Sequence, residues 1–412
     1  MTATFPNHFL WGAAGAGHQL DGNDVTSDTS FVEHLDATAF AQPSGIACDS
    51  WNRWAEDLDL VKSLGLNAYR FSIEWSRIEP TPGVIDQQAL DHYDRMIDGC
   101  LERGLVPAVT LCHFSLPYWA AVKGSWLDPD VRAMFADHCA RVMGRYGDRV
   151  GMAVTINEPN LYLLLSYLLP DVVYEGRRAM IAEASRKAGV DRFLGAHLMV
   201  PEDFDATTEA QTQAHKLAVK AIRSVAPQVP VGMSLAAAAD EALTPRGAEI
   251  LAAKRERCYG PWVEPTKGDD FIAVQIYEKN EYDDNGMLRP RSGVPTNDMG
   301  SEVRPECLAE GIRYYHELTG LPIAVTEHGL SSDDDAQRCR MIEEGLPAFK
   351  QVVDSGEVPC FAYFHWSIMD NFEWEAAYNR HLGLCSVDRG TLERTPKASA
   401  KAYANLVRQW TA

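Results

Sequence analysis

The sequence predicts an α/β protein that folds as a single (β/α)8 barrel. Eight short apolar, β-rich runs recur along its 412 residues. These runs are mostly continuous rather than alternating, as in parallel strands covered by helices, and the segments between them suit amphipathic helices. No Pro/Gly/Ser-rich linker separates the repeats. Two doubly wound domains would produce a similar alternation, but the count of eight favours one barrel domain over residues 1–412.

The expected strands can be placed in order along the chain. They are FLWGAA from Phe9, AYRFSI from Ala68, VPAVTL from Val106, GMAVTIN from Gly151, PVGMSLA from Pro230, DFIAVQIY from Asp270, PIAVTEH from Pro322 and PCFAYFHWS from Pro359. Two of the intervening helices are especially clear, over 51–65 and 91–104. Each has apolar residues along one face and ends on a glycine, the residue that most often terminates a helix.

Composition and charge exclude several classes of protein. Hydrophobic residues make up 46% of the chain and charged residues 23%, which is typical of a globular protein rather than a disordered or fibrous one. The formal net charge is −20, from 58 acidic and 38 basic residues. Such a field repels nucleic acid and anionic membrane surfaces, so we expect neither as a partner. Homo-oligomer formation is left open.

The chain offers no sign of export, membrane insertion or metal binding. Its longest apolar run, LYLLLSYLL at 161–169, is too short to cross a bilayer, and its start lacks the basic and apolar segments of a signal peptide. Nine cysteines form no CxxC pair, and no HExxH motif occurs. We therefore expect a cytoplasmic protein with reduced thiols, no metal and no cofactor.

Polar and aromatic residues stand at or just beyond the ends of the expected strands. They are His113, Asn157, Glu158, Tyr277, Glu327 and Trp366, with Arg70 slightly earlier in its own run. In a barrel of this type, the carboxyl ends of the strands carry the active site. Glu158 and Glu327 close the fourth and seventh runs, so both are expected to project into the same mouth.

Two carboxylates that flank one bond are what glycoside hydrolysis requires. One protonates the leaving oxygen, and the other attacks the anomeric carbon or activates water. Either glutamate alone could equally be a strand-end cap or an ion-pair partner. No GxSxG motif and no phosphate-binding GK[ST] loop occurs, which gives serine-hydrolase and nucleotide-dependent chemistry no support.

Six further motifs follow one another along nearly the whole chain: FLWGAAGAGHQLDG, NAYRFSIEWSRIEP, VTLCHFSLPYW, VTINEPN, VTEHGL and FHWSIMDNFEW. Together, and in this order, they resemble the motifs of glycoside hydrolase family 1, the β-glucosidase and β-galactosidase family. The resemblance implies a TIM barrel that hydrolyses β-glycosides with retention. It assigns Glu158 as acid/base and Glu327 as nucleophile. A retaining pair has its carboxyls about 5 to 5.5 Å apart.

The resemblance also implies roles for the residues around the pair. Arg70 and Tyr277 would lie beside the nucleophile and keep it ionised, and Glu158 would then hold the proton. The glycone would be bound by Gln19, His113, Asn157, Glu373 and Trp374, with Trp366 as a platform under the sugar ring. Glu373 would repel a phosphate, so a neutral β-glycoside is expected, a β-glucoside first and a β-galactoside or β-fucoside as alternatives.

Several positions depart from the family pattern. His18 replaces a tyrosine, Gln275 an asparagine, His328 the asparagine after the nucleophile, and Leu382 an aromatic residue. The segment after Pro159 lacks the usual glycine-rich loop. Its residues Leu164, Tyr167 and Leu168 suggest a hydrophobic aglycone, although the same residues could simply pack a helix. Transfer of the sugar to an alcohol is a further expectation, and a catalytically weak or silent sugar-binding protein is the alternative.

Overall fold

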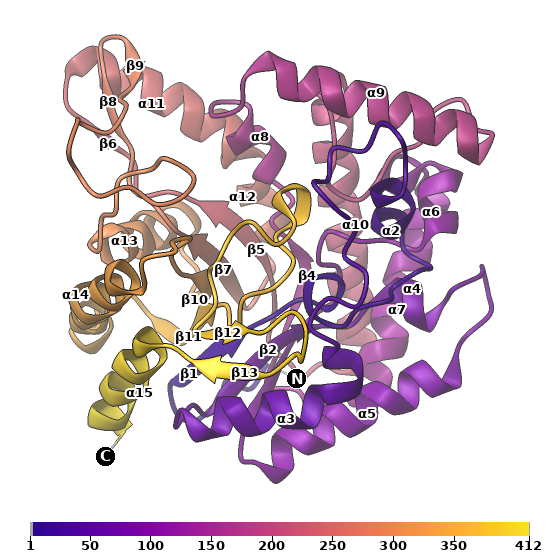
Figure 1. Ribbon diagram of the computed structural model, residues 1–412, viewed down its shortest axis with the longest axis horizontal. Coiled ribbons are helices and arrows are strands. Elements are labelled where there is room, and N and C mark those ends of the chain that lie inside the picture. Colours follow the sequence, from indigo (N-terminus) through magenta and orange to yellow (C-terminus); the bar gives the residue numbers. More distant parts are fainter. Residues whose placement is uncertain (1–2, 412) are drawn as a thin grey trace.

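The computed structural model describes residues 3–411, and its centre is a closed barrel of eight parallel strands (Figure 1). Around the barrel the strand order is β1-β2-β3-β4-β5-β7-β10-β11, which returns to β1. The strands are β1 (Leu10–Ala14), β2 (Ala68–Ser72), β3 (Val106–Thr110), β4 (Met152–Asn157), β5 (Val231–Ala237), β7 (Phe271–Ile276), β10 (Ile323–His328) and β11 (Cys360–Trp366). Seven of them lie within their predicted runs and β5 extends one residue beyond its run, to Ala237, so the predicted barrel is confirmed.

Helices surround the barrel and connect its strands. They are α1 (Gly17–Leu20), α2 (Asp28–Glu33), α3 (Ser50–Ser63), α4 (Trp75–Ile78), α5 (Gln87–Glu102), α6 (Tyr118–Lys123), α7 (Pro129–Tyr146), α8 (Leu161–Leu165), α9 (Asp171–Ala188), α10 (Phe204–Val225), α11 (Pro245–Cys258), α12 (Gly260–Thr266), α13 (Cys307–Thr319), α14 (Asp335–Asp354) and α15 (Ala398–Thr411). The two helices predicted in most detail correspond to α3 and α5. Glycines with positive φ follow both, Gly65 at 77° and Gly104 at 69°.

Short elements decorate the barrel. A three-stranded sheet comprises β6 (Glu241–Ala242), β8 (Glu281–Asp283) and β9 (Gly286–Met287), and a hairpin comprises β12 (Cys385–Val387) and β13 (Arg394–Pro396). Three 3₁₀ turns are η1 (Ser125–Leu127), η2 (Pro201–Asp203) and η3 (Trp374–Ala376). The turn η3 follows β11 and carries Trp374 to the carboxyl end of the barrel.

The barrel interior is filled by side chains of very different size. Phe271, Phe364 and Met152 are fully buried and pack there with alanines from several strands. A Cβ on Gly12 would lie 2.5 Å from the Phe364 ring, and a Cβ on Gly232 would lie 2.3 Å from the Phe271 carbonyl oxygen. These glycines therefore leave room for the large rings, as close packing of the interior requires.

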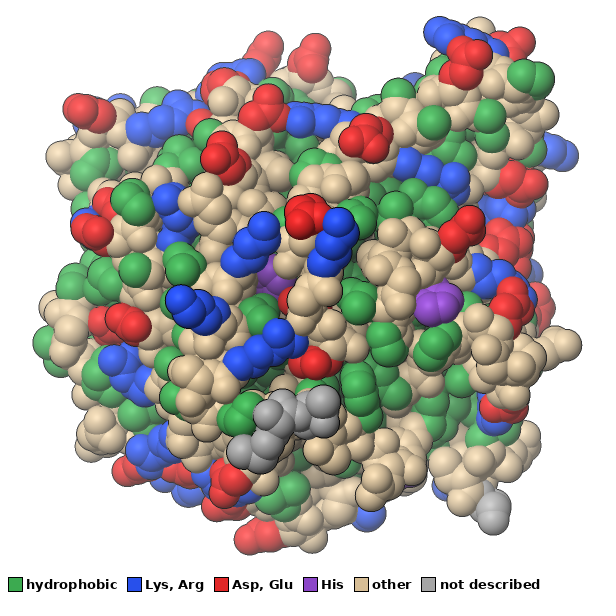
Figure 2. All heavy atoms as spheres, turned by 180° about the vertical axis from the view of Figure 1, so that it is seen from behind, with side chains coloured by type: hydrophobic (Ala, Val, Ile, Leu, Met, Phe, Trp, Pro, Cys, Tyr) green, Lys and Arg blue, Asp and Glu red, His purple; other side chains and the backbone are tan. Residues whose placement is uncertain are grey.

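The surface carries charges of both signs. On the face opposite to that of Figure 1, acidic and basic side chains are interspersed (Figure 2). Arg149, in the turn after α7, binds Asp94 at 2.7 Å and Asp98 at 2.6 Å, both on α5. Among residues 3–411, no helix is long and apolar enough to cross a membrane.

Candidate active site

The carboxyl ends of the barrel strands bring the two glutamates and their expected neighbours together. Glu158 directly follows β4, and Glu327 is the penultimate residue of β10. The strand pairing is irregular at both places, between Val154 and Asn157 and between Val325 and Glu327. Such irregularities redirect side chains, and here they occur where the strands reach the site. Both glutamates are buried, with 9% of Glu158 and 4% of Glu327 exposed.

Glu327 is held by three donors. Arg70 Nη1 donates to Oε1 at 2.7 Å, and Gln275 Nε2 donates to the same oxygen at 2.8 Å. The hydroxyl of Tyr277 donates to Oε2 at 2.6 Å. Burial raises the pKa of Glu327, whereas the charge of Arg70 and the hydrogen bonds from Tyr277 and Arg70 lower it. These contacts stabilise the carboxylate against the cost of burying its charge.

Glu158 lies in a different environment. Its backbone has a φ of 43°, in the left-handed region, and its amide donates to the Ser234 carbonyl oxygen at 2.9 Å. Within the described residues, its carboxyl group has no hydrogen-bond partner. Burial, and then the negative charge of Glu327, raise the pKa of Glu158 well above its ordinary value. A proton shared by the two carboxyls therefore favours Glu158, which leaves a neutral acid opposite a paired carboxylate.

Asn157 connects the residues that hold Glu327 with Ser234, which contacts the Glu158 backbone. Its Oδ1 accepts hydrogen bonds from Arg70 Nη2 at 2.5 Å, Gln275 Nε2 at 2.7 Å and Ser234 Oγ at 3.2 Å. Its Nδ2 is buried and has no partner among residues 3–411. Because a buried donor without a partner is costly, this amide is available for a ligand hydroxyl.

Gln275 was missed as a site residue from the sequence, where it appeared only as a departure from the family pattern. It lies directly opposite Glu327 in the β7–β10 register and contacts both Glu327 and Asn157. A usable signal was present, because Gln275 and Tyr277 are two residues apart and so face the same side of the strand.

Replacement of Gln275 by Leu is expected to lower kcat/KM about 10- to 100-fold, since Glu327 loses a buried hydrogen-bond donor that contributes about 1–3 kcal/mol. Steady-state kinetics on the neutral β-glycoside that the sequence predicts as substrate measures the change. The matched control is Gln275→Asn, which keeps the amide on a shorter side chain and is expected to retain more of the activity. Equal activity of Gln275→Leu and wild type would show that the contact does not matter for catalysis.

The residues expected to bind the glycone gather beside the glutamates. Gln19 Nε2 donates to the Phe372 carbonyl oxygen at 2.8 Å and approaches Glu373 Oε2 at 3.4 Å, while Gln19 Oε1 is buried without a partner in the described chain. Burial and the charge of Glu327 raise the pKa of Glu373 to about 8. The His113 ring is nearly parallel to Trp366, with centroids 5.5 Å apart, and to Trp374, at 6.2 Å.

His18 adds a further ring next to Trp374. Its imidazole is nearly parallel to Trp374, with centroids 5.7 Å apart, and its Nε2 lies 2.5 Å from Glu33 Oε1. Burial alone lowers the pKa of His18, but Asp24 and Glu33 outweigh it and raise the pKa to about 10. His18 is therefore a buried cation next to Trp374, where the family pattern has a neutral tyrosine.

The remaining departures have simple structural explanations. His328 points away from the Glu327 carboxylate, since successive residues of a strand face opposite sides. Its Nδ1 lies 2.8 Å from the Tyr363 hydroxyl, and burial lowers its pKa to about 3, so it packs behind the strand as a neutral ring. Leu382 is 4% exposed and packs in the same cluster as Trp366.

A metal site would require His, Cys, Asp or Glu side chains grouped together within residues 3–411. That part of the chain holds no group of three or more His, Cys, Asp or Glu side chains placed to bind a metal ion. All nine cysteines lie in it, and each is a free thiol.

Comparison with known proteins agrees with the architecture. The profile of Glycosyl hydrolase family 1 matches residues 1–266 and 270–411. A β-glucosidase of Agrobacterium is 30% identical over 465 positions, which cover 98% of this chain and 96% of the relative. A solved β-glucosidase structure superposes with a TM-score of 0.92 at 38% identity, and a β-glycosidase structure with 0.90 at 40%. These two alignments cover 97% and 98% of this chain, and 98% and 97% of the solved chains.

The barrel, the buried carboxyl pair and these similarities define a glycoside hydrolase, and more narrowly a β-glycosidase. The chain belongs to glycosyl hydrolase family 1. The Agrobacterium alignment is longer than the 412-residue chain, which shows that this member lacks segments present in its relative.

Proposed function

We propose that this enzyme is a retaining exo-β-glycosidase that cleaves neutral β-glycosides, β-glucosides first, through a covalent glycosyl-enzyme. The observation that carries the proposal is the contrast between the two glutamates. Glu327 is a carboxylate held by Arg70, Gln275 and Tyr277, whereas the carboxyl group of Glu158 has no hydrogen-bond partner among residues 3–411 and holds the proton. This is the division of labour that double displacement at an anomeric carbon requires.

In the first step, a Glu327 oxygen attacks the anomeric carbon as the bond to the leaving oxygen breaks, and Glu158 donates its proton to that oxygen. The leaving group departs as an alcohol, and Glu327 becomes an ester of the sugar. Because its negative charge is then gone, the pKa of Glu158 falls, and Glu158 can take a proton from water. The water oxygen attacks the anomeric carbon, releasing the sugar and regenerating both carboxyls. An alcohol in place of water gives transglycosylation.

Stereochemistry is the direct test of this mechanism. When a nitrophenyl β-glucoside is hydrolysed in an NMR tube, the first sugar to appear is expected to be the β anomer, before mutarotation. First appearance of the α anomer would show inversion and rule out the double displacement. No turnover of glucosyl, galactosyl, fucosyl or xylosyl donors would instead favour a silent sugar-binding protein.

The preference for glucose rests on the glycone side of the pocket. Gln19, Asn157 and Glu373 place hydrogen-bonding groups around the space beside the glutamates, and Trp366 offers an apolar face. The relatives include a bifunctional β-D-glucosidase/β-D-fucosidase of Bifidobacterium breve, 28% identical over 99% of both chains. A fucoside is therefore the first alternative to a glucoside, and galactosides follow.

We further propose that the leaving group is hydrophobic. Tyr167 is 43% exposed and Leu168 45% exposed, both just after α8, and Leu164 is partly buried against the core. This segment follows Glu158 closely, so it extends the acid/base side of the site. The structural relatives include a Thermotoga maritima β-glucosidase bound to an N-octyl-bearing inhibitor, 25% identical with a TM-score of 0.82 over 99% of both chains.

A substrate panel tests the hydrophobic leaving group. Octyl and aryl β-glucosides are expected to give kcat/KM at least about 10-fold above cellobiose, because burial of several CH₂ groups contributes about 0.8 kcal/mol each. Tyr167→Ser and Leu168→Ser are expected to reduce that preference and to leave cellobiose hydrolysis unchanged. Preference of the wild type for cellobiose would contradict the proposal.

We also propose that residues 1–412 act as one catalytic domain in the cytoplasm. Strands that begin at Leu10 and end at Trp366 close a single barrel, and the thiols are free. The human cytosolic β-glucosidase is 28% identical over 98% of both chains. One domain is expected to unfold in a single cooperative transition, as calorimetry can measure.

A further inference from the structure

We propose that Arg177 on α9 is a positioning residue for the sugar-binding side of the site: it holds the turn η3 in place and so positions Glu373 and Trp374. This role rests on the proposed function, in which Glu373 and Trp374 bind the glycone. Arg177 was not singled out from the sequence. It lies in the helix that follows the segment after Pro159, where the usual glycine-rich loop of the family is missing.

The contact between α9 and η3 is an ion pair with two hydrogen bonds. Arg177 Nε donates to Glu375 Oε1 at 3.0 Å, and Arg177 Nη2 donates to Oε2 at 2.6 Å. The Arg177 side chain is 3% exposed and that of Glu375 is 29% exposed. A planar guanidinium that binds both oxygens of a carboxylate fixes its orientation as well as its distance. Because Glu375 directly follows Trp374 in η3, this pair fixes the turn relative to α9.

The backbone of this turn requires support from its surroundings. Trp374 has a φ of 47°, in the left-handed region that costs a bulky residue energy. Ala377 has a φ of 53° with a ψ of −122°, a combination that glycine adopts most readily. Residues in such conformations persist only where the rest of the structure holds them. The ion pair of Arg177 supplies part of that hold.

Glu373 depends on this backbone more than on contacts of its own side chain. Within residues 3–411, its carboxylate has one hydrogen-bonding contact, from Gln19 Nε2 at 3.4 Å, which is long. Its backbone amide donates to the Ala377 carbonyl oxygen at 2.6 Å, across the turn. A movement of η3 therefore carries the Glu373 carboxylate with it.

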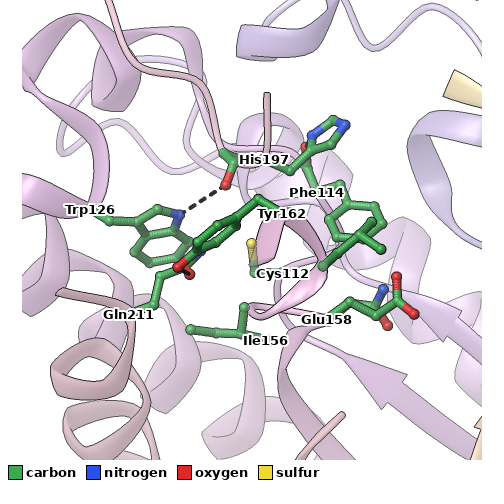
Figure 3. Close-up of a pocket in the computed structure, with 11 residues that line it drawn as sticks. Cys112, Phe114, Trp126, Ile156, Glu158, Tyr162, His197 and Gln211 are labelled. Atoms are coloured by element: carbon green, nitrogen blue, oxygen red, sulfur yellow. Dashed lines mark hydrogen bonds between the residues drawn. The ribbon is translucent and has the colours of Figure 1, made fainter. Parts of the chain in front are cut away.

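Trp374 is surrounded by rings that leave it little free space. His18 lies nearly parallel to it at 5.7 Å, and Phe114 and His197 contact it edge-on at 5.3 and 4.8 Å. Figure 3 shows Phe114 between His197 and Glu158, and the cavity that these three residues line has a volume of about 10 Å³, enough for one water. A shift of η3 would push the indole against these rings, so the ion pair and the packing together define one position for it.

The helix α9 is itself held firmly, so it can fix the position of η3. Met180 and Ala184 of α9 belong to the same buried apolar cluster as Phe372 and Ala377, which flank the turn. Glu183 of α9 also accepts hydrogen bonds from two backbone amides of the loop after α2. Arg177 therefore extends from a fixed support.

The test measures sugar binding with deoxynojirimycin, a glucose analogue bound in a solved Thermotoga maritima β-glucosidase structure. Arg177→Met is expected to raise its calorimetric Kd and the KM for a nitrophenyl β-glucoside about 10- to 100-fold, as a displacement of about 1 Å can, and to change kcat less than about threefold. Arg177→Lys keeps the charge but not the planar fork, so its Kd is expected to lie between those of wild type and Arg177→Met. The matched control is Arg178→Met, because Arg178 is the next residue of α9 and binds Glu202 through two hydrogen bonds, away from η3. Its Kd is expected to equal that of the wild type.

Two results would overturn the positioning role: a Kd and KM in Arg177→Met equal to those of the wild type, or a fall in kcat with an unchanged Kd. If circular dichroism shows that Arg177→Met does not fold, Glu375→Gln decides in its place. This variant removes the charge of the partly exposed partner but keeps an oxygen that accepts from Arg177; a raised Kd is expected, and a wild-type Kd would refute the role. Binding needs no turnover, and hydrolysis of the nitrophenyl β-glucoside by the wild type tests the proposed function separately.

Discussion

Replacement of Glu327 by Gln is expected to lower kcat by about 10⁴-fold or more, because an amide cannot form the glycosyl ester. The loss has a second source. Arg70 is buried and binds Glu327 at 2.7 Å, so the neutral side chain leaves a buried guanidinium without its counterion. Single-turnover kinetics on an activated aryl β-glucoside measures the chemical step. The matched control is Glu317→Gln, a change of an exposed glutamate on α13 that is expected to leave kcat unaltered.

A smaller side chain at position 327 reveals on which face of the sugar ring Glu327 lies. Glu327→Gly removes the carboxylate and leaves space beside the anomeric carbon, so a small anion such as azide can enter there. Azide is expected to restore turnover of an activated donor and to give the α-glycosyl azide, with inversion. A β-glycosyl azide from this variant would place Glu327 on the other face and contradict its assignment as nucleophile.

Replacement of Glu158 by Gln is expected to lower kcat/KM by about 10²- to 10⁴-fold for poor leaving groups, and far less for dinitrophenolate, which departs without a proton. The leaving-group dependence distinguishes loss of an acid from general damage to the site. It is measured as the slope of log kcat/KM against leaving-group pKa, which is expected to steepen in the variant. Equal losses for all leaving groups would contradict the acid role.

The pH dependence of kcat/KM follows from the protonation states of Glu158 and Glu327. Glu158 must be protonated to act, and its pKa is raised, so wild-type kcat/KM is expected to persist above the pH range in which a glutamate ordinarily titrates and to fall as pH rises through the raised pKa. On the acid side, activity is expected to fall as the pH drops through the pKa of Glu327 and this carboxylate becomes protonated. In Glu158→Gln the alkaline decline is expected to disappear. An alkaline decline that persists unchanged would assign it to another group.

The barrel was predictable because its cause is local in the sequence. Continuous apolar runs such as PIAVTEH and VTIN can be buried on both faces only when helices cover the sheet, and eight of them close a barrel. The ends of those runs then point to Glu158 and Glu327. The direction of His328 follows from the same strand, because it comes directly after Glu327 and so faces the opposite side. The structure places it against Tyr363.

Other parts of the site depend on contacts between distant segments. Gln275 reaches Glu327 only through the β7–β10 register, and His18 becomes a buried cation only because Asp24 and Glu33 fold around it. His197 lies in an irregular segment between α9 and α10 that has no motif. Only the folded chain brings its Nδ1 to the Phe114 carbonyl oxygen and its ring to a cavity that Glu158 also lines.

The most direct test of the central claim is covalent trapping of the enzyme. A 2-deoxy-2-fluoro β-glucosyl donor with a good leaving group slows the second step more than the first, so the glycosyl-enzyme accumulates. Peptide mass spectrometry is expected to find one fluoroglucosyl group per chain, on Glu327 in the peptide containing VTEHGL. Activity should be lost at the same rate as the label is gained. A label on Glu158 or on any other residue, or turnover of the donor without a label, would contradict the account.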